Sequence, residues 1–80
     1  MIEDPIIASS ALKHGLGKEE ILHAYRNPVR VWDMVWDLGE GFSMIVGPNA
    51  AAILLEAGYV EGDTALVIVH AMRARAKFLR

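Results

Sequence analysis

Residues 65–80, ALVIVHAMRARAKFLR, decide how the rest of the chain is interpreted. The stretch begins with an unbroken apolar run from Ala65 to Val69, rich in β-branched residues, which is typical of a strand covered on both faces. It then becomes basic and contains no acid. The ionisable side chains after the run are His70, Arg73, Arg75, Lys77 and Arg80. The sequence therefore predicts a buried strand that brings an imidazole and several cations to a rigid edge of the domain.

Charge is distributed unevenly along the chain, although the net charge is only −2. Residues 70–80 carry four cations and no acid, whereas residues 1–69 carry four cations and all 10 acids. Such an asymmetry indicates an anionic partner at the basic end. With equal weight it is typical of a solvated tail whose Lys and Arg stems lie along apolar surface.

The length of 80 residues predicts a single small domain spanning residues 1–80. Because 54% of the residues are hydrophobic and 22% are charged, a disordered chain is excluded. There is no cysteine, so disulfides and thiolate metal sites are excluded, and we expect no cofactor. The N-terminus lacks the features of a signal peptide, and no apolar run approaches the roughly 20 residues that span a membrane. We therefore expect a cytoplasmic protein without membrane contact.

The first third of the chain predicts two short helices. Asp4 and Pro5 are typical of a helix start, so the first helix is expected over residues 5–14 and ends at Gly15. Gly17 begins a second helix with two acids in its first turn, and Asn27-Pro28 ends it. Neither helix would be stable alone at this length, so both must pack on another layer.

That layer is a predicted antiparallel sheet. Strands are expected over residues 29–37 and 42–46, with a turn at residues 38–41 between them and another turn at residues 47–49. Residues 49–58 are typical of a helix by propensity, whereas residues 52–60 are typical of a strand by position. Residues 61–63 predict a hairpin turn into Ala65. The result is an α+β domain, with two short N-terminal helices packed on a three- to four-stranded antiparallel sheet.

Histidine and arginine near the chain end form the main chemical constellation. Three histidines, at positions 14, 23 and 70, have no metal-ligand spacing, so we expect no metal site. His70 could act as acid or base in RNA cleavage, with Arg73 and Arg75 holding the phosphate. Because His70 shares strand parity with Leu66 and Ile68, the alternative is a strand-end histidine bonded to a backbone carbonyl.

Other candidate residues also have two interpretations. Trp32 and Trp36 could stack on bases, but core packing is favoured. His14 is interpreted as a helix C-terminal cap rather than a catalyst. Glu56 lies in an apolar run, and is either the exposed position of a strand or a carboxylate that faces the same cleft as His70.

A series of short motifs resembles the BrnT-type toxins of type II toxin–antitoxin pairs, which belong to the RelE-like superfamily. The resemblance covers residues 10–76, in order and without large gaps. The matching motifs are Leu12-Lys13-His14-Gly15-Leu16, Glu19-Glu20, Ala24, Asn27-Pro28, Ile45-Val46-Gly47, Leu54-Leu55-Glu56 and Val67-Ile68-Val69.

This resemblance implies a RelE-like fold, a strand over most of residues 49–60, and a metal-independent endoribonuclease neutralised by a cognate antitoxin. In the nuclease hypothesis for this chain, His70 is the acid or base, Arg73 and Arg75 hold the phosphate, and Lys13, Lys77 and Arg80 bind the RNA. One departure stands out: Met72 occupies the place of the family's catalytically important arginine, and His70 that of a serine. The alternative function is therefore a non-catalytic interaction module, which binds a protein through its tryptophan face or forms a homodimer by edge-strand pairing.

Overall fold

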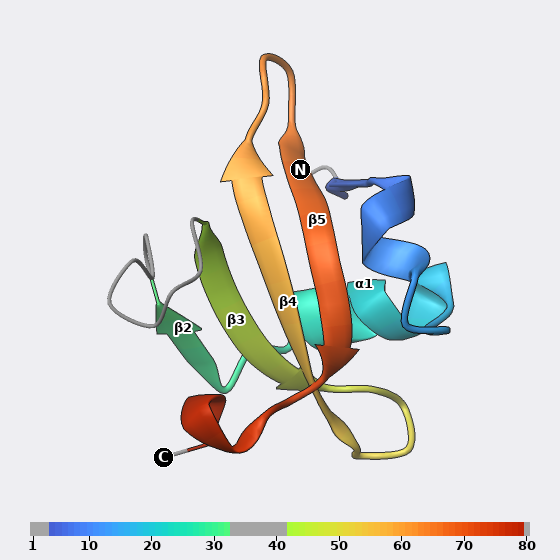
Figure 1. Ribbon diagram of the computed structural model, residues 1–80, viewed down its shortest axis with the longest axis vertical. Helices are drawn as coiled ribbons and strands as arrows, with labels where there is room; N and C mark the ends of the chain where they lie inside the picture. Colours follow the sequence, from blue (N-terminus) through green and yellow to red (C-terminus); the bar gives the residue numbers. More distant parts are fainter. Residues whose placement is uncertain (1–3, 33–41, 80) are drawn as a thin grey trace.

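The structure, a computed structural model, describes residues 4–32 and 42–79. In chain order the elements in Figure 1 are β1 (Ile6–Ile7), the 3-10 helix η1 (Ser9–Leu12), α1 (Lys18–Arg26), β2 (Arg30–Trp32), β3 (Ser43–Pro48), β4 (Leu54–Glu61), β5 (Leu66–Arg73) and the 3-10 helix η3 (Ala76–Phe78).

The strands form one five-stranded mixed sheet in the order β1-β5-β4-β3-β2. Strand β1 pairs with β5 in parallel, and all other neighbours are antiparallel. Strands β4 and β5 form the long central hairpin that the turn at residues 61–63 predicts. Their pairing contains a β-bulge: Gly58 lies opposite His70 and Tyr59 lies opposite Ile68, so Val69 is the extra residue.

The predicted fold of two helices on an antiparallel sheet is wrong, because the first predicted helix does not form. Ile6 and Ile7 instead pair with β5, and the Ala8 N–H donates to the Ile68 carbonyl oxygen. Asp4 forms an ion pair with Arg26 rather than capping a helix. A short helix gains little free energy by itself. Residues 6–7 therefore pair with the long strand β5, and residues 9–12 form one 3-10 turn, despite the local signals for a helix.

The second predicted helix is confirmed as α1. Gly17 is its N-cap, and the Glu20 side chain accepts a hydrogen bond of 2.9 Å from the Gly17 N–H. Asn27 is its C-cap, directly before Pro28. Here the local signals and the tertiary packing agree, so the sequence alone places both ends of the helix.

Residues 54–61 are a strand, as the resemblance implies, and not the helix that propensity favours. Asn49 prevents the helix by closing a turn: its side-chain oxygen accepts hydrogen bonds from the N–H groups of Ala51 and Ile53. Ala52 lies in the left-handed region with φ of 65°. Of the predicted strand at 29–37, residues 30–32 form β2, whereas residues 33–37 and the turn at 38–41 lie outside the described residues.

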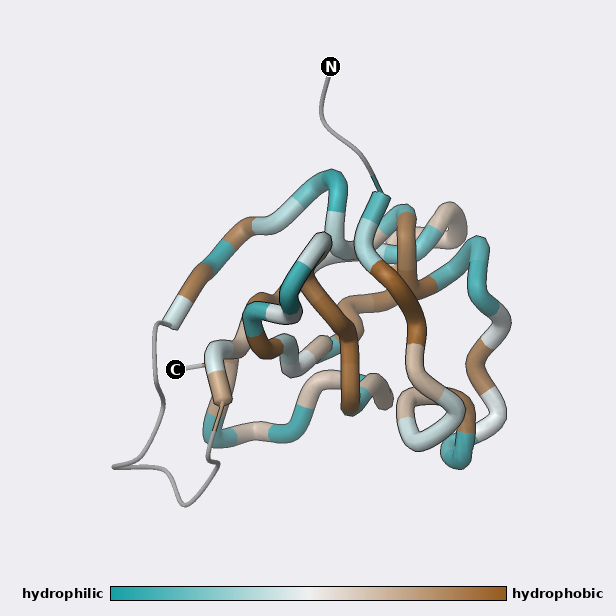
Figure 2. The backbone as a smooth tube through the Cα atoms, turned by 90° about the horizontal axis from the view of Figure 1, so that it is seen from above, coloured by the Kyte–Doolittle hydropathy of each residue, from teal (hydrophilic) through white to brown (hydrophobic). Residues whose placement is uncertain are grey.

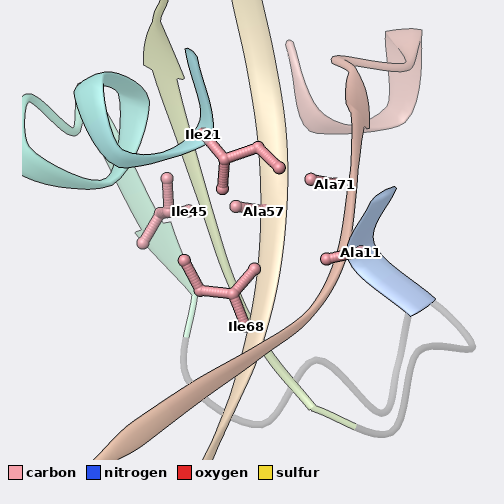
Figure 3. Close-up of a cluster of buried hydrophobic side chains, with 6 residues drawn as sticks. All are labelled: Ala11, Ile21, Ile45, Ala57, Ile68 and Ala71. Carbon is pink, nitrogen blue, oxygen red and sulfur yellow. The ribbon is translucent and has the colours of Figure 1, made fainter. Parts of the chain in front are cut away.

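One face of the sheet packs against η1 and α1. The side chains between them form a cluster that is fully or nearly buried (Figure 3). Its members are Ala11, Ile21, Ile45, Ala57, Ile68 and Ala71. Helix α1 lies close to the sheet because Gly47 of β3 has no side chain, and a Cβ there would overlap the Ala24 carbonyl oxygen.

The chain's own C-terminal segment, Ala74 to Leu79, covers one end of the opposite face. This segment leaves β5 and crosses the ends of β4 and β3 toward β2 (Figure 1). Its Phe78 is fully buried against Met44 and Val46 of β3, with the Trp32 ring centroid 5.4 Å away. In Figure 2 the hydrophobic stretches accordingly run largely through the middle of the domain. Among the described residues, no helix is long and apolar enough to cross a membrane.

Replacing Gly47 with alanine tests the close approach of α1 to the sheet. We expect G47A to lower the free energy of unfolding by about 1–3 kcal/mol, because the new methyl group meets backbone that cannot rotate away. Urea denaturation measures the change. Gly17→Ala is the comparison variant: its Cβ would make only an ordinary contact of 3.7 Å with the Glu20 carboxylate, so we expect only the smaller cost of alanine at an N-cap. Equal stability of the two variants would contradict this packing.

Candidate functional site

A buried carboxylate lies on β4, the middle strand, on the sheet face that the C-terminal segment partly covers. The Glu56 side chain is completely buried, between Val46 of β3 and Met72 of β5 in the register of the sheet. An isolated carboxylate in such a position costs several kcal/mol, on the order of the whole stability of a small domain. It therefore requires strong hydrogen-bond donors nearby.

Arg75 and His70 supply those donors. The Arg75 backbone N–H donates to one Glu56 oxygen at 2.8 Å, and its guanidinium donates through Nε at 3.0 Å and 3.1 Å and through Nη2 at 2.6 Å. The His70 Nε2 lies 2.8 Å from the second carboxylate oxygen. Among the described residues, no buried side-chain nitrogen or oxygen lacks a hydrogen-bond partner.

These contacts keep Glu56 ionised. Burial by itself raises the pKa of Glu56, but the hydrogen bonds from His70 and Arg75 and the charge of Arg75 outweigh it and lower the pKa from 4.5 to about 2. An ionised carboxylate only accepts hydrogen bonds, so the His70 Nε2 must carry a hydrogen. The remaining ring nitrogen of a neutral His70, Nδ1, is then the one that can accept a proton.

The β-bulge places His70 on this face. Ile68 packs toward α1, and regular alternation would point His70 the same way. Because Val69 is inserted in the pairing, His70 instead shares its face with Glu56 and reaches its carboxylate. The predicted parity of His70 with Ile68 is therefore wrong, and so is the alternative in which a backbone carbonyl binds the imidazole.

Two further rings contact the His70 imidazole. The His14 ring meets it edge-on, with the centroids 5.7 Å apart and the planes at 80°, and the Phe42 ring lies tilted at 5.8 Å. Phe42 fits there because Gly58, opposite His70, has no side chain to obstruct its ring. The His70 side chain remains 15% exposed, and His14 is exposed at the surface beside it.

His14 reaches His70 from the N-terminal segment. After β1 ends, η1 continues along β5, where the Ser10 hydroxyl donates to the Val69 carbonyl oxygen at 2.7 Å. Gly15, with φ of 83°, then turns the chain in a conformation that few other residues adopt. The prediction that His14 caps a helix is wrong, because η1 ends at Leu12 and the imidazole contacts His70 instead.

The structure brings together only part of the predicted set. Arg75 joins His70 through Glu56, but Arg73 lies opposite Leu55 on the other face of the sheet and is exposed. Lys13 is exposed and next to His14 in the chain. The Lys77 Nζ lies 5.2 Å from the Phe78 ring centroid, and the Arg75 guanidinium lies 5.4 Å from it. Arg80 is outside the described residues.

The structure also decides between the two interpretations of Trp32 and of Glu56. Trp32 packs against Phe78, which confirms the core interpretation, and Trp36 lies outside the described residues. Glu56 is a fully buried carboxylate on the same face as His70, not an exposed strand position. An acid inside the apolar run LLEAGYV is the sequence signal that identifies it. No local signal indicates that His14 and Phe42 meet His70, because both contacts depend on the tertiary fold.

Comparisons with known proteins give no relatives: no protein-family model, curated protein or solved structure matches the chain. Within residues 4–32 and 42–79, no group of three histidine or acidic side chains is arranged to hold a metal ion. The site as described is therefore built from an imidazole pair, an ionised carboxylate and a guanidinium.

Replacing Glu56 with glutamine tests the low pKa. In the wild type, the pKa is lower in the folded protein than in the unfolded chain, so its stabilisation is complete above pH 4.5 and declines as the pH falls toward 2. This difference corresponds to about 3 kcal/mol. We expect E56Q to be less stable than wild type at pH 7, and to lose less stability between pH 5 and 3. Denaturant titration at each pH measures both effects.

Glu61→Gln provides the matched control, because Glu61 is an exposed acid at the end of the same strand. We expect E61Q to retain the acid dependence of the wild type. An E56Q protein whose stability declines with acid as steeply as that of the wild type would mean that Glu56 is not the group that titrates.

Proposed function

We propose that the protein is a metal-independent endoribonuclease, the toxin of a toxin–antitoxin pair, in which His70 is the general base. The observation that carries the proposal is the hydrogen bond of 2.8 Å from the His70 Nε2 to the buried, ionised Glu56. A carboxylate behind an imidazole fixes its tautomer and stabilises the imidazolium that forms when the other nitrogen accepts a proton. His70 therefore has the arrangement of a general base.

RNA suits a base of this kind because it carries its own nucleophile. When His70 Nδ1 removes the proton of a 2′-hydroxyl, the 2′-oxygen attacks the adjacent phosphorus. The bond from phosphorus to the 5′-oxygen breaks, leaving a 2′,3′-cyclic phosphate and a 5′-hydroxyl end. No metal is needed, since an imidazole can accept the proton and protein cations balance the phosphate charge.

Two cations belong to this site or adjoin it in the chain. Lys13 adjoins His14, and the Arg75 side chain is 36% exposed although it binds Glu56. Arg75 thus has two roles in the proposal: it keeps Glu56 ionised and it presents positive charge beside His70. Binding by such a group of cations weakens as salt rises. The toxin role and the antitoxin partner rest on the sequence resemblance described above.

A non-catalytic interaction module is the second candidate, and exposed apolar residues favour it. Val29 and Val31, at the β2 edge of the sheet, are 61% and 55% exposed. An edge strand with apolar side chains is a surface to which another chain can add. In that case the contact between Glu56 and Arg75 serves only to hold the C-terminal segment on the sheet.

Glutamine in place of His70 separates the two functions. The glutamine amide can still donate to Glu56, so the fold is retained, but it cannot accept a proton at neutral pH. We expect wild-type protein to cleave RNA in the presence of EDTA and H70Q to be slower by at least about 100-fold. Mapping of cleavage ends on total RNA and on purified transcripts measures the effect, and inducible expression should arrest growth only with an active protein.

His23→Gln is the matched control. It is the same substitution on α1, where the His23 Nδ1 contacts the Pro48 carbonyl oxygen at 2.7 Å and not the site. Arg75→Ala is a poor test, because it would leave the Glu56 charge buried without its main partner and cost about 3–5 kcal/mol. Folded wild-type protein that neither cleaves RNA nor arrests growth would refute the nuclease and favour the interaction module.

A further inference from the structure

His14 is the one imidazole in contact with His70, and the function proposed above does not use it. Its ring meets the His70 ring edge-on at a centroid separation of 5.7 Å. It comes from the turn after η1, far from β5 in the sequence, and it is exposed where His70 is nearly covered. A substrate that reaches the small exposed part of His70 therefore also meets His14.

Cleavage of RNA requires a second proton transfer. The 5′-oxygen leaves as a strongly basic alkoxide unless an acid protonates it as the bond to phosphorus breaks. His70 cannot supply this proton in the same step, because its Nδ1 is taking a proton from the 2′-hydroxyl and its Nε2–H is bound to Glu56. A different group must do so.

The groups that contact His70 leave one choice among the described residues. Glu56 is ionised and has no proton to give. Arg75 stays protonated under all conditions of interest, and the Phe42 ring has no proton to transfer. Lys13 precedes His14 in the chain, but the rings that contact His70 are those of His14 and Phe42.

We infer that His14 is the general acid of this site, an inference that rests on the proposed ribonuclease function. As His70 Nδ1 accepts the 2′-hydroxyl proton, protonated His14 donates its proton to the departing 5′-oxygen. The products are the 2′,3′-cyclic phosphate and the 5′-hydroxyl, and the two histidines have exchanged protonation states. Because His14 is exposed, exchange with water restores both.

A change of leaving group tests this assignment. The probe is an RNA oligonucleotide that contains a mapped cleavage site, made with either the natural 5′-oxygen or a bridging 5′-sulfur at that bond. A thiolate leaves without protonation, so the sulfur substrate needs the base but not the acid. We expect H14Q to cleave the oxygen substrate at least about 100-fold more slowly than wild type, and the sulfur substrate less than about tenfold more slowly. H70Q should lose activity on both.

The controls make each outcome decisive. H23Q should match the wild type on both substrates, and H14Q should retain the wild-type melting temperature because His14 is exposed. If H14Q is as active as the wild type on the oxygen substrate, His14 is not the acid although the ribonuclease stands. If H14Q loses activity on both substrates equally, the role of His14 is in binding and the inference fails. If the wild type cleaves neither, the ribonuclease proposal itself fails.

Discussion

The structure depends on one buried carboxylate and its two partners. Glu56 lies in the middle of the sheet, and its charge can remain there only while His70 and Arg75 donate to it. Because Arg75 follows the end of β5, this requirement brings the chain back across the sheet. That return places Phe78 over Met44 and Val46 and covers one end of the second face. The C-terminal segment is thus positioned by an ion pair and secured by an aromatic ring.

The same ion pair changes the meaning of the basic C-terminal end. Counted along the sequence, the cations after the last strand form one group. In the fold they separate: Arg75 turns inward to Glu56, whereas Arg73 is exposed on the opposite face. Alternation along a strand sends side chains two ways, so a count of charges overestimates the positive potential at any one site.

Local signals predict those parts of the fold in which they agree with tertiary packing. Helix α1 carries a capping residue at each end, and the turn at residues 61–63 leads into β5; both are found where the sequence places them, whereas the sequence leaves residues 49–58 open between helix and strand. The first predicted helix fails because Ile6 and Ile7 pair with a strand sixty residues away. No local pattern can indicate such a pairing, and at this length its hydrogen bonds outweigh helix propensity.

The candidate site follows the same rule. His70 and Arg75 are identifiable from residue type, and Glu56 from its position in an apolar run. The sheet face that His70 occupies cannot be identified from the sequence, because the bulge at Val69 reverses the alternation that would otherwise turn the imidazole toward α1. The contact with His14 likewise depends on η1 lying along β5.

Stability alone is a poor reason for this arrangement. Replacing a buried ion pair with apolar side chains of similar size is often neutral or stabilising, and the surroundings of Glu56 are already apolar. The chain instead carries the acid, its guanidinium partner and a β-bulge that turns an imidazole toward them. A fixed tautomer on a partly exposed histidine is what these three features produce together, and an apolar core could not supply it.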